Sequence, residues 1–355
     1  MLYAGFFLSR NGYNGPMNIV NAFEGLLLPG LVGDHDGVIE TVLSKLFIRG
    51  DEVHKAYKHR TADFADLADR SVRRKYIAED FFWNNIMAPN VYLELRGVRR
   101  EGDQFVHVDH KEGEDWYIVM RKIDNERNLM RALEEGILPG GKLGEYVGAL
   151  YARLEMLTEA RKQGLKEFFD KEALHVREEV IGTRDWAYTA EPHLSRADVD
   201  RAAELMERVL SAEAYFQNPI KTLSVVIDTN PENIFLFDEG VSFIDVMPPK
   251  DAWRVHDRYF ALCRTSADVS ALVGKTHAEA LHDSYEALSP LPPEAVRMVY
   301  EIAAALIQTP YRKMVGRDDL AAKYADYVRS RSEDLALLLE EKSRSIGLSS
   351  FVSGE

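Results

Sequence analysis

The stretch IDTNPENIFLFDEGVSFIDVM, residues 227–247, constrains the fold more than any other part of the chain. It holds two short apolar runs, 233–237 and 241–245, with Asp238-Glu239-Gly240 between them. Apolar runs of this length separated by such residues predict two strands joined by a tight turn. A β-hairpin is therefore expected here, inside a part of the chain that otherwise predicts helices.

Polar side chains lie at the open end of this hairpin. Asn233 begins one strand and Asp245 ends its partner, so antiparallel pairing is expected to bring them side by side. An amide oxygen and a carboxylate at that separation suit Mg²⁺ that bridges phosphates. Asp228, on the preceding loop, is placed to accept a proton from an attacking hydroxyl. The alternative is an Asx-rich turn before a structural hairpin, with Pro231 as turn former.

The first third of the chain predicts an antiparallel sheet with one long helix. Residues 38–57 predict a hairpin that turns at Arg49-Gly50-Asp51, and residues 66–88 predict a helix that Pro89 stops. Three further strands are expected after it, with turns at Gly97 and at 112–114, and they cover residues 90–100, 103–110 and 115–123.

The remainder predicts mainly helices. Ser195 is a candidate N-cap, with Asp198 in the first turn of its helix. The expected helices cover residues 143–164, 195–216, 292–311 and 318–344. The fold class is therefore α+β, with a β-rich lobe over residues 1–122, a helical lobe that carries the hairpin over 123–345, and a frayed tail over 346–355.

Composition excludes several classes of protein. The net charge of -14 argues against nucleic acid as main partner, because phosphate backbones select basic surfaces. Apolar segments end before membrane-spanning length, and the first fifteen residues lack the basic region and cleavage pattern of a signal peptide. The one cysteine, Cys263, fits a reducing cytoplasm. The oligomeric state is left open.

The loop DTNPEN, residues 228–233, resembles the catalytic loop of the protein-kinase-like superfamily, and Asp245 falls where that superfamily has its second metal-binding aspartate. The longer string resembles bacterial aminoglycoside phosphotransferase-like proteins. This resemblance implies a bilobal kinase-like fold, ATP and Mg²⁺ as cofactors, and Asn233 and Asp245 as metal ligands. It also implies that Asp228 orients and deprotonates a hydroxyl of the acceptor.

The first lobe supplies the other residues that a kinase-like fold requires. Lys55, with Lys58 as the close alternative, is expected to hold the α- and β-phosphates. Glu79, with Asp80 next to it, is expected to pair with that lysine. The resemblance extends to an E-T-x-x-S strand and an A-P-x-x-Y-L segment. The residues that match these two motifs are Glu40, Thr41, Ser44, Ala88, Pro89, Tyr92 and Leu93. The resemblance also implies that Ser44 contacts phosphate and that the backbone near Met120 contacts adenine.

The chain departs from the family pattern around Asp228. Val226 and Asn230 replace the family's histidines, and Met247 replaces a later acidic residue. Asn230 can still donate a hydrogen bond to a γ-phosphate, but it carries no positive charge. Asp257 or Asp268 corresponds to the family's later aspartate that anchors the loop, and apolar neighbours favour Asp268.

Two functions are consistent with these residues. The first is an ATP-dependent phosphotransferase that acts on a hydroxyl of a small molecule, such as an aminoglycoside or amino sugar. The second is a kinase-like regulatory protein that holds nucleotide without efficient transfer. Neither involves nucleic acid or a membrane.

Overall fold

The computed structural model describes residues 36–352, apart from gaps at 42, 63–64, 103, 137–142, 151, 154–173, 218–220, 224–229, 239 and 247–254. By their contacts, the described residues form two compact units. The sheet unit takes those up to Asn128 and those from Asn233 to Asp251, and the helical unit takes those in Leu129–Glu232 and Ala252–Glu355. The hairpin, which was expected in the helical lobe, groups with the sheet unit by its contacts.

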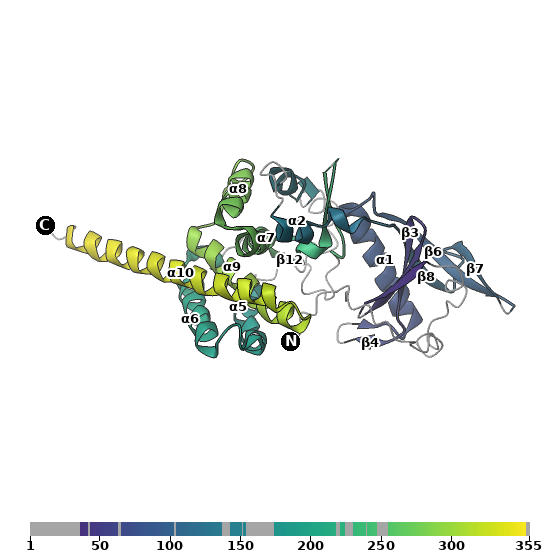
Figure 1. Cartoon of the computed structure of the whole chain (residues 1–355), viewed down its shortest axis with the longest axis horizontal. Helices are drawn as coiled ribbons and strands as arrows, with labels where there is room; N and C mark the ends of the chain where they lie inside the picture. Colours follow the sequence, from purple (N-terminus) through teal and green to yellow (C-terminus); the bar gives the residue numbers. More distant parts are fainter. Residues whose placement is uncertain are drawn as a thin grey trace. The chain divides into compact units, whose positions relative to one another are not determined.

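The sheet unit is built on a six-stranded antiparallel sheet in the order β1-β2-β3-β8-β6-β7 (Figure 1). Its strands are β1 (Gly37–Glu40), β2 (Ser44–Arg49), β3 (Glu52–Tyr57), β6 (Tyr92–Glu101), β7 (Gln104–Asp109) and β8 (Asp115–Arg121). The small hairpin β4 (Thr61–Ala62) and β5 (Ala65–Asp66), the helix α1 (Arg70–Met87) and the 3₁₀ turn η3 (Asn125–Arg127) complete the N-terminal part.

The strand expected before residue 49 is divided into two. β1 and β2 pair antiparallel with each other, and Thr41 and Ser44 close the turn between them. The Thr41 N–H donates to the Ser44 carbonyl at 2.9 Å, and the Ser44 N–H donates to the Thr41 hydroxyl at 2.8 Å. Short hydroxyl side chains offer the backbone such local bonds in place of a ladder. This is why an apolar pattern that predicts one strand forms a hairpin.

Gly97 lies inside β6 and does not form the predicted turn. A Cβ at this position would lie 2.7 Å from the Cα of Gly113, in the turn between β7 and β8. Real Cβ atoms do not approach backbone this closely, so both positions require glycine. The glycine that suggested a turn instead permits close contact between a strand and a neighbouring turn.

Helix α1 ends where the sequence predicts, but it begins at Arg70 and not at residue 66, because Ala65–Asp66 form strand β5. Asp69 caps its start by accepting from the N–H groups of Ser71 and Val72, and Pro89 follows its end. The buried Arg73 side chain donates to Asp115, with Nη2 2.6 Å from Oδ2. This bond holds the first turn of α1 against the start of β8.

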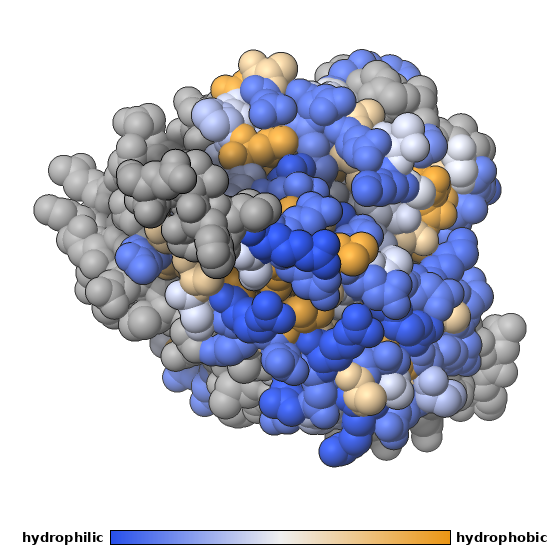
Figure 2. All heavy atoms as spheres, turned by 90° about the vertical axis from the view of Figure 1, so that its left-hand side faces the viewer, coloured by the Kyte–Doolittle hydropathy of each residue, from blue (hydrophilic) through white to orange (hydrophobic). Residues whose placement is uncertain are grey.

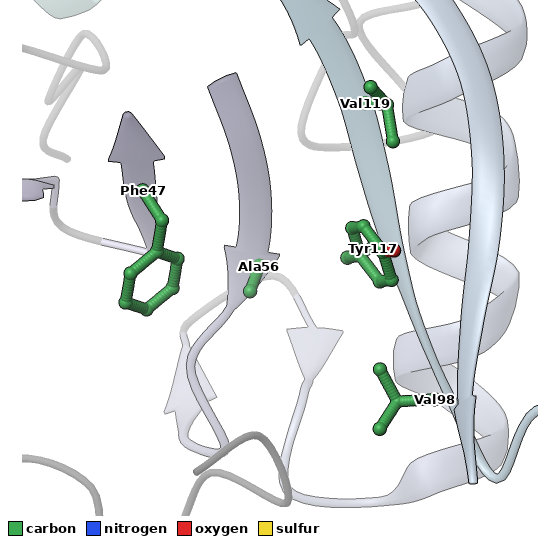
Figure 3. Close-up of a cluster of buried hydrophobic side chains, with 5 residues drawn as sticks. All are labelled: Phe47, Ala56, Val98, Tyr117 and Val119. Atoms are coloured by element: carbon green, nitrogen blue, oxygen red, sulfur yellow. The ribbon is translucent and has the colours of Figure 1, made fainter. Parts of the chain in front are cut away.

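The two faces of the sheet have different roles. Side chains alternate along a strand, so Lys55 and Ala56 point to opposite faces. The face with Ala56 carries an apolar cluster of five aromatic and aliphatic side chains from four strands, drawn in Figure 3 as Phe47, Ala56, Val98, Tyr117 and Val119. The other face carries Lys55, and α1 packs there against β6 and β8. The face beneath α1 therefore carries the ion pairs of Lys55, and the opposite face also holds the buried polar side chains of Lys45 and His54.

The helical unit surrounds α9 (Glu294–Met314), whose side chains are almost all buried. It packs against α5 (Leu174–Ala187), α6 (Arg196–Ala212), α7 (Arg258–Val273) and α10 (Asp318–Val352), as Figure 1 shows. The unit also contains α2 (Leu129–Glu135), a helix over residues 143–150, α8 (Lys275–Glu286), the 3₁₀ turns η4 (Tyr188–Ala190) and η5 (Ala214–Gln217), and a short ladder of β9 (Lys221–Leu223) with β12 (Val255–Asp257).

Helix ends confirm some expectations and correct others. Ser195 and Asp198 form a capping box at the start of α6, as predicted. Helix α9 continues past Pro310, although a proline removes one backbone hydrogen bond. The Thr309 hydroxyl donates to the Ala305 carbonyl at 2.8 Å in this turn, and Trp186 donates to the Ile307 carbonyl at 3.1 Å. Side chains thus satisfy carbonyls near the proline.

The surface drawn in Figure 2 is largely hydrophilic, and its hydrophobic residues form small separate groups. Single exposed hydrophobic residues of this kind are normal on folded proteins. Along the described part of the chain, no helix combines the length and hydropathy that a membrane crossing requires.

Candidate active site

The predicted hairpin is present, with its register shifted by one residue. Strands β10 (Ile234–Phe237) and β11 (Gly240–Phe243) pair Phe237 with Gly240, so two residues form the turn instead of three. Gly240 has φ 139°, a conformation that favours glycine. The Ile244 N–H donates to the Asn233 carbonyl at 2.9 Å. Asn233, in the 3₁₀ turn η6 (Pro231–Asn233), is therefore opposite Ile244 and not opposite Asp245.

Asp245 lies just beyond the ladder in an unusual backbone conformation. Its φ is 56°, and it is the one described residue other than glycine with a positive φ. Such a conformation costs about 1–3 kcal/mol and persists only where neighbouring groups impose it. Its N–H lies 3.3 Å from the hydroxyl oxygen of Tyr92, which accepts. Strain at a predicted metal ligand favours a functional role for this residue.

Lys55 joins the hairpin to helix α1. Its Nζ lies 2.7 Å from Oδ1 of Asp245 and 3.1 Å from Oδ2 of Asp80. The side chains of Lys55 and Asp80 are buried, whereas Asp245 is 22% exposed. We call these three residues the Lys55 cluster. The three side chains come from β3, from α1 and from the segment after β11, although 190 residues separate Lys55 from Asp245.

The carboxylate that reaches Lys55 from α1 belongs to Asp80, so the predicted pairing with Glu79 is corrected. Successive residues of an α-helix point about 100° apart, so only one of two neighbours can face the sheet. Asp80 is 2% exposed and faces Lys55, whereas Glu79 is only partly buried. Sequence alone placed a carboxylate on this turn of helix but did not identify which one faces inward.

Of the two candidate lysines, it is Lys55 that contacts the carboxylates of Asp80 and Asp245. Lys58 instead lies 2.7 Å from Glu40 Oε1 and donates to the Thr41 carbonyl. Burial alone would lower the pKa of Lys55, but the carboxylates of Asp245 and Asp80 outweigh it and hold that pKa well above its ordinary value. The ammonium is therefore charged at neutral pH.

Charge in the Lys55 cluster favours a bound cation. One ammonium faces two carboxylates, so with all three groups ionised the cluster carries one negative charge in excess. Burial raises the pKa of Asp80, although Lys55 opposes that change. A second positive charge near the partly exposed Asp245 would relieve this imbalance.

The residues present fit Mg²⁺ with few protein ligands. Asn233 and Asp245 both belong to the sheet unit and supply an amide and a carboxylate oxygen. Among the described residues, no three side chains of histidine, cysteine, aspartate or glutamate gather into a metal site. Mg²⁺ commonly binds one or two protein groups and completes its shell with water and phosphates, so this sparse donor set suits it.

Three further side chains support the Lys55 cluster, and of these the sequence had singled out only Tyr92, as part of the A-P-x-x-Y-L segment. The Tyr57 hydroxyl donates to Oδ2 of Asp80 at 2.8 Å, and Asn84 Nδ2 donates to Oδ1 of Asp80 at 2.7 Å. The third is Tyr92, which holds the Asp245 N–H. Spacing along α1 could have indicated Asn84, because it lies four residues after Asp80 on the same helix face.

Ser44 and Met120 lie on the same sheet face as Lys55. Ser44 pairs with Tyr57 in the ladder, and Met120 follows Ile118, which pairs with Lys55. The Ser44 hydroxyl lies 2.8 Å from that of Thr41. Their predicted contacts with phosphate and adenine stay predictions.

Within the loop predicted to be catalytic, the described residues 230–232 belong to the helical unit, whereas Asn233 belongs to the sheet unit. Asp228 lies outside the described residues, as do Val226 and Met247. Asn230 is 1% exposed, and its Oδ1 accepts from Arg312 Nη2 at 3.3 Å. Nη1 of the same arginine lies 2.5 Å from Oε1 of Glu232. Arg312, which the sequence did not indicate, thus fastens the end of this loop to α9.

Both candidates for the loop-anchoring aspartate have partners within the helical unit. Asp257 caps α7 and accepts from the hydroxyls of Tyr215 and Tyr300. Asp268 accepts from the Tyr324 hydroxyl at 2.6 Å. Burial raises the pKa of Asp268 to about 6. The described part of the loop contacts Arg312 and Tyr311 of α9, and an anchoring role for Asp268 stays a prediction.

The sequence matches no protein-family model and no curated protein. Similar solved structures include a thermostable mutant of an aminoglycoside phosphotransferase in its apo form, with 10% identity, TM-score 0.48 and coverage of 85% of this chain and 93% of that one. The GDP complex of an aminoglycoside 2'-phosphotransferase has 9% identity and TM-score 0.43, and the match covers 85% of this chain and 92% of that one. Choline kinase from Cryptosporidium parvum has 10% identity and TM-score 0.43, with coverage of 87% and 88%.

At identities of 9–10% and TM-scores below 0.5, these matches establish neither the fold nor the function of this chain. The α+β architecture itself is evident from the antiparallel sheet unit and the helical unit. The proposed function therefore rests on the residues of this chain.

Proposed function

We propose that the protein is an ATP-dependent phosphotransferase that moves the γ-phosphate of Mg-ATP to a hydroxyl of a small molecule. The observation that carries this proposal is the Lys55 cluster, with its buried ammonium between the carboxylates of Asp80 and Asp245. In the sequence, the DTNPEN loop contains Asp228, the residue expected to act on the acceptor.

A purely structural role explains the Lys55 cluster poorly. Buried ion pairs are often no more stabilising than apolar side chains of similar size, because desolvation offsets their attraction. This cluster also leaves one carboxylate in excess and includes a backbone in a costly conformation at Asp245. Perturbed ionisable groups and local strain together are typical of functional sites.

Each member of the cluster has a task in the proposed reaction. Lys55 donates to the α- and β-phosphates, and Asp80 orients its ammonium from α1. Asn233 and Asp245 hold Mg²⁺, whose contribution when bound is to neutralise charge on the phosphates. The Asp245 carboxylate now contacts Lys55 at 2.7 Å, so both groups lie where one nucleotide could engage them.

The acceptor is activated from the loop in this proposal. Asp228 orients the acceptor hydroxyl and accepts its proton, as the resemblance implies. Arg312 supports this by holding the next described residues of the loop, Asn230 and Glu232. Aminoglycosides and amino sugars are the acceptors that the resemblance suggests.

One observation favours the second candidate, a nucleotide-binding regulatory protein. Asn230 was expected to donate to the γ-phosphate, yet its side chain is buried and its oxygen accepts from Arg312 and from the Glu232 N–H. This contact gives Asn230 a task in loop structure. A protein that binds Mg-ATP and transfers phosphate to no acceptor would be this second candidate.

The first test compares Lys55→Met with Lys58→Met. Each change removes one ammonium near the start of the sheet, but only Lys55 contacts Asp80 and Asp245. We expect Lys55→Met to weaken Mg-ATP binding about 10- to 100-fold, as for loss of one charge-assisted hydrogen bond. Isothermal titration with Mg-ATP measures this effect, and Lys58→Met should bind within about twofold of wild type.

The same proteins then enter a phosphate-transfer assay with a panel of hydroxyl acceptors. Transfer by wild type that Lys55→Met abolishes supports the phosphotransferase. Binding of Mg-ATP by wild type with no transfer to any acceptor supports the regulatory protein instead. Absence of Mg-ATP binding by the wild-type protein would contradict both.

A further inference from the structure

Asn84 is the polar side chain that links helix α1 to the segment after the hairpin. It is 0% exposed. Its Nδ2 donates to Oδ1 of Asp80 at 2.7 Å and to the Asp80 carbonyl at 3.0 Å. Its Oδ1 accepts from the N–H of Val246 at 3.1 Å. A single amide therefore contacts the residue that orients Lys55 and the residue that follows Asp245.

The chemistry of this position requires both a donor and an acceptor. The carboxylate of Asp80 can only accept, and the buried Val246 N–H can only donate. A side-chain amide presents both groups a short distance apart. Leucine, close in size, would leave the Val246 N–H without its acceptor and Asp80 with one donor fewer.

The contact with Val246 acts next to the strained residue. The N–H groups of Asp245 and Val246 are consecutive, and each is held by a side chain, of Tyr92 and Asn84 respectively. Two fixed N–H groups in succession define the path of the backbone where φ is 56°. Without them, Asp245 can relax to the ordinary negative φ region, which redirects its carboxylate.

From these contacts we propose that Asn84 is a positioning residue for the Mg²⁺ and nucleotide site. It sets the Asp245 carboxylate and the Asp80–Lys55 pair in one fixed arrangement by bonding to both. The inference rests on the proposed function, because it assigns Asn84 a task in binding Mg²⁺ together with ATP.

The test uses Asn84→Leu in the full chain. MgCl₂ is titrated at fixed ATP, and the Mg²⁺ concentration at half-maximal thermal stabilisation is measured. Loss of a residue that orients a metal ligand weakens metal binding about 10- to 100-fold, and we expect a shift of this size. Where an acceptor is found, the apparent kcat of transfer measured at subsaturating Mg²⁺ should fall by a similar factor.

Asn85→Ala is the matched control. Asn85 lies on the same turn of α1, and its Nδ2 donates to the Tyr92 carbonyl at 2.6 Å. The bonds to Asp80 and to Val246 on which the proposal rests are formed by Asn84 and not by Asn85. We expect this variant to lose some thermal stability but to keep the Mg²⁺ midpoint of the wild type within about threefold.

Asn84→Ser covers the case in which the leucine variant fails to fold. Its single hydroxyl cannot reach both partners, so the Mg²⁺ midpoint should still rise by about tenfold. Hydrogen exchange at the Val246 amide should be faster in this variant than in wild type. A folded Asn84 variant with the wild-type Mg²⁺ midpoint overturns the inference and leaves the proposed function standing. Wild-type protein that binds no Mg-ATP overturns both.

Discussion

Buried ionised side chains in this protein differ in how well their charge is balanced. Lys55 contacts two carboxylates at 2.7 and 3.1 Å. Asp268 accepts one hydrogen bond, from Tyr324, and its Oδ2 has no hydrogen-bond partner among the described residues. Burial disfavours the charged form of both side chains. At Lys55 the two carboxylates outweigh this effect, whereas at Asp268 burial raises the pKa to about 6.

This raised pKa predicts a pH dependence of stability. The value of about 6 lies above the ordinary 3.8, so the folded state holds a proton that the unfolded state has already released between these values. The contribution of Asp268 to the free energy of unfolding must then fall as pH rises through this window. It stays low at higher pH. The difference in pKa corresponds to about 3 kcal/mol.

Urea unfolding at a series of pH values measures this effect in wild type and Asp268→Asn. The stability of wild type minus that of the variant should decrease by about 3 kcal/mol from about pH 4 to about pH 7. Asp283→Asn, at an exposed position on α8, controls for the loss of one charge. A difference that increases with pH would contradict the assignment.

At the scale of elements, α9 connects the core of the helical unit to the predicted catalytic loop. The helix packs against α5, α6, α7 and α10, and Arg312 near its end is fully buried. The guanidinium reaches Glu232 and Asn230 with different nitrogens. Two fixed donors of this kind hold a loop in one orientation, which the single ammonium of lysine does not reproduce.

We therefore expect Arg312→Lys to lower the rate of phosphate transfer without weakening Mg-ATP binding. A small displacement of a catalytic group can cost about 100-fold in rate, so kcat should fall about 10- to 100-fold. The nucleotide contacts proposed here all belong to the sheet unit, whereas Arg312 belongs to the helical unit. Transfer assays at saturating Mg-ATP measure the fall.

Arg317→Lys, just beyond the end of α9, is the control for this substitution. Arg317 is partly exposed and pairs with Asp319 and Glu134 at the surface. Its loss should change kcat little, because exposed ion pairs contribute weakly. Equal losses in both variants would show that Arg312 acts only through general stability.

At the scale of the whole molecule, the proposed tasks divide between the two units. Lys55, Asp80, Asn233 and Asp245 belong to the sheet unit, so the proposed nucleotide and Mg²⁺ contacts lie within one compact body. Asn230 and Arg312 belong to the helical unit. Binding and transfer should therefore be separable by mutation.

Asp228→Ala tests this separation. The variant should lose transfer by about 100- to 10,000-fold, as for removal of a general base, while Mg-ATP binding stays near wild type. Asp238→Ala removes a carboxylate that is 93% exposed in the turn of the hairpin, and it should keep full activity. Calorimetry and the transfer assay give the two readings. Full turnover by Asp228→Ala with a verified acceptor would contradict the proposed mechanism.

Most elements of this fold follow from local patterns. Ser195 and Pro89 mark helix ends that depend on local backbone geometry and hydrogen bonds, and these ends are where the sequence predicts them, whereas α1 begins at Arg70 instead of residue 66. Gly97 was predicted to lie in a turn but lies inside β6. Its role depends on the close approach of the turn at Gly113, which no local pattern contains.

For the candidate site, the sequence by itself indicated the residue types and the elements that carry them. It indicated a lysine on β3, a carboxylate on α1 and an aspartate after the hairpin, because these residue types recur with fixed order and spacing. Only the tertiary structure chose Asp80 over Glu79 and Lys55 over Lys58, and only it placed Asn84 beside Val246. Those choices depend on which helix face packs on the sheet and on bonds across 162 residues of sequence. Tertiary packing and long-range hydrogen bonds decide which of these side chains meet, and no local pattern in the sequence contains that information.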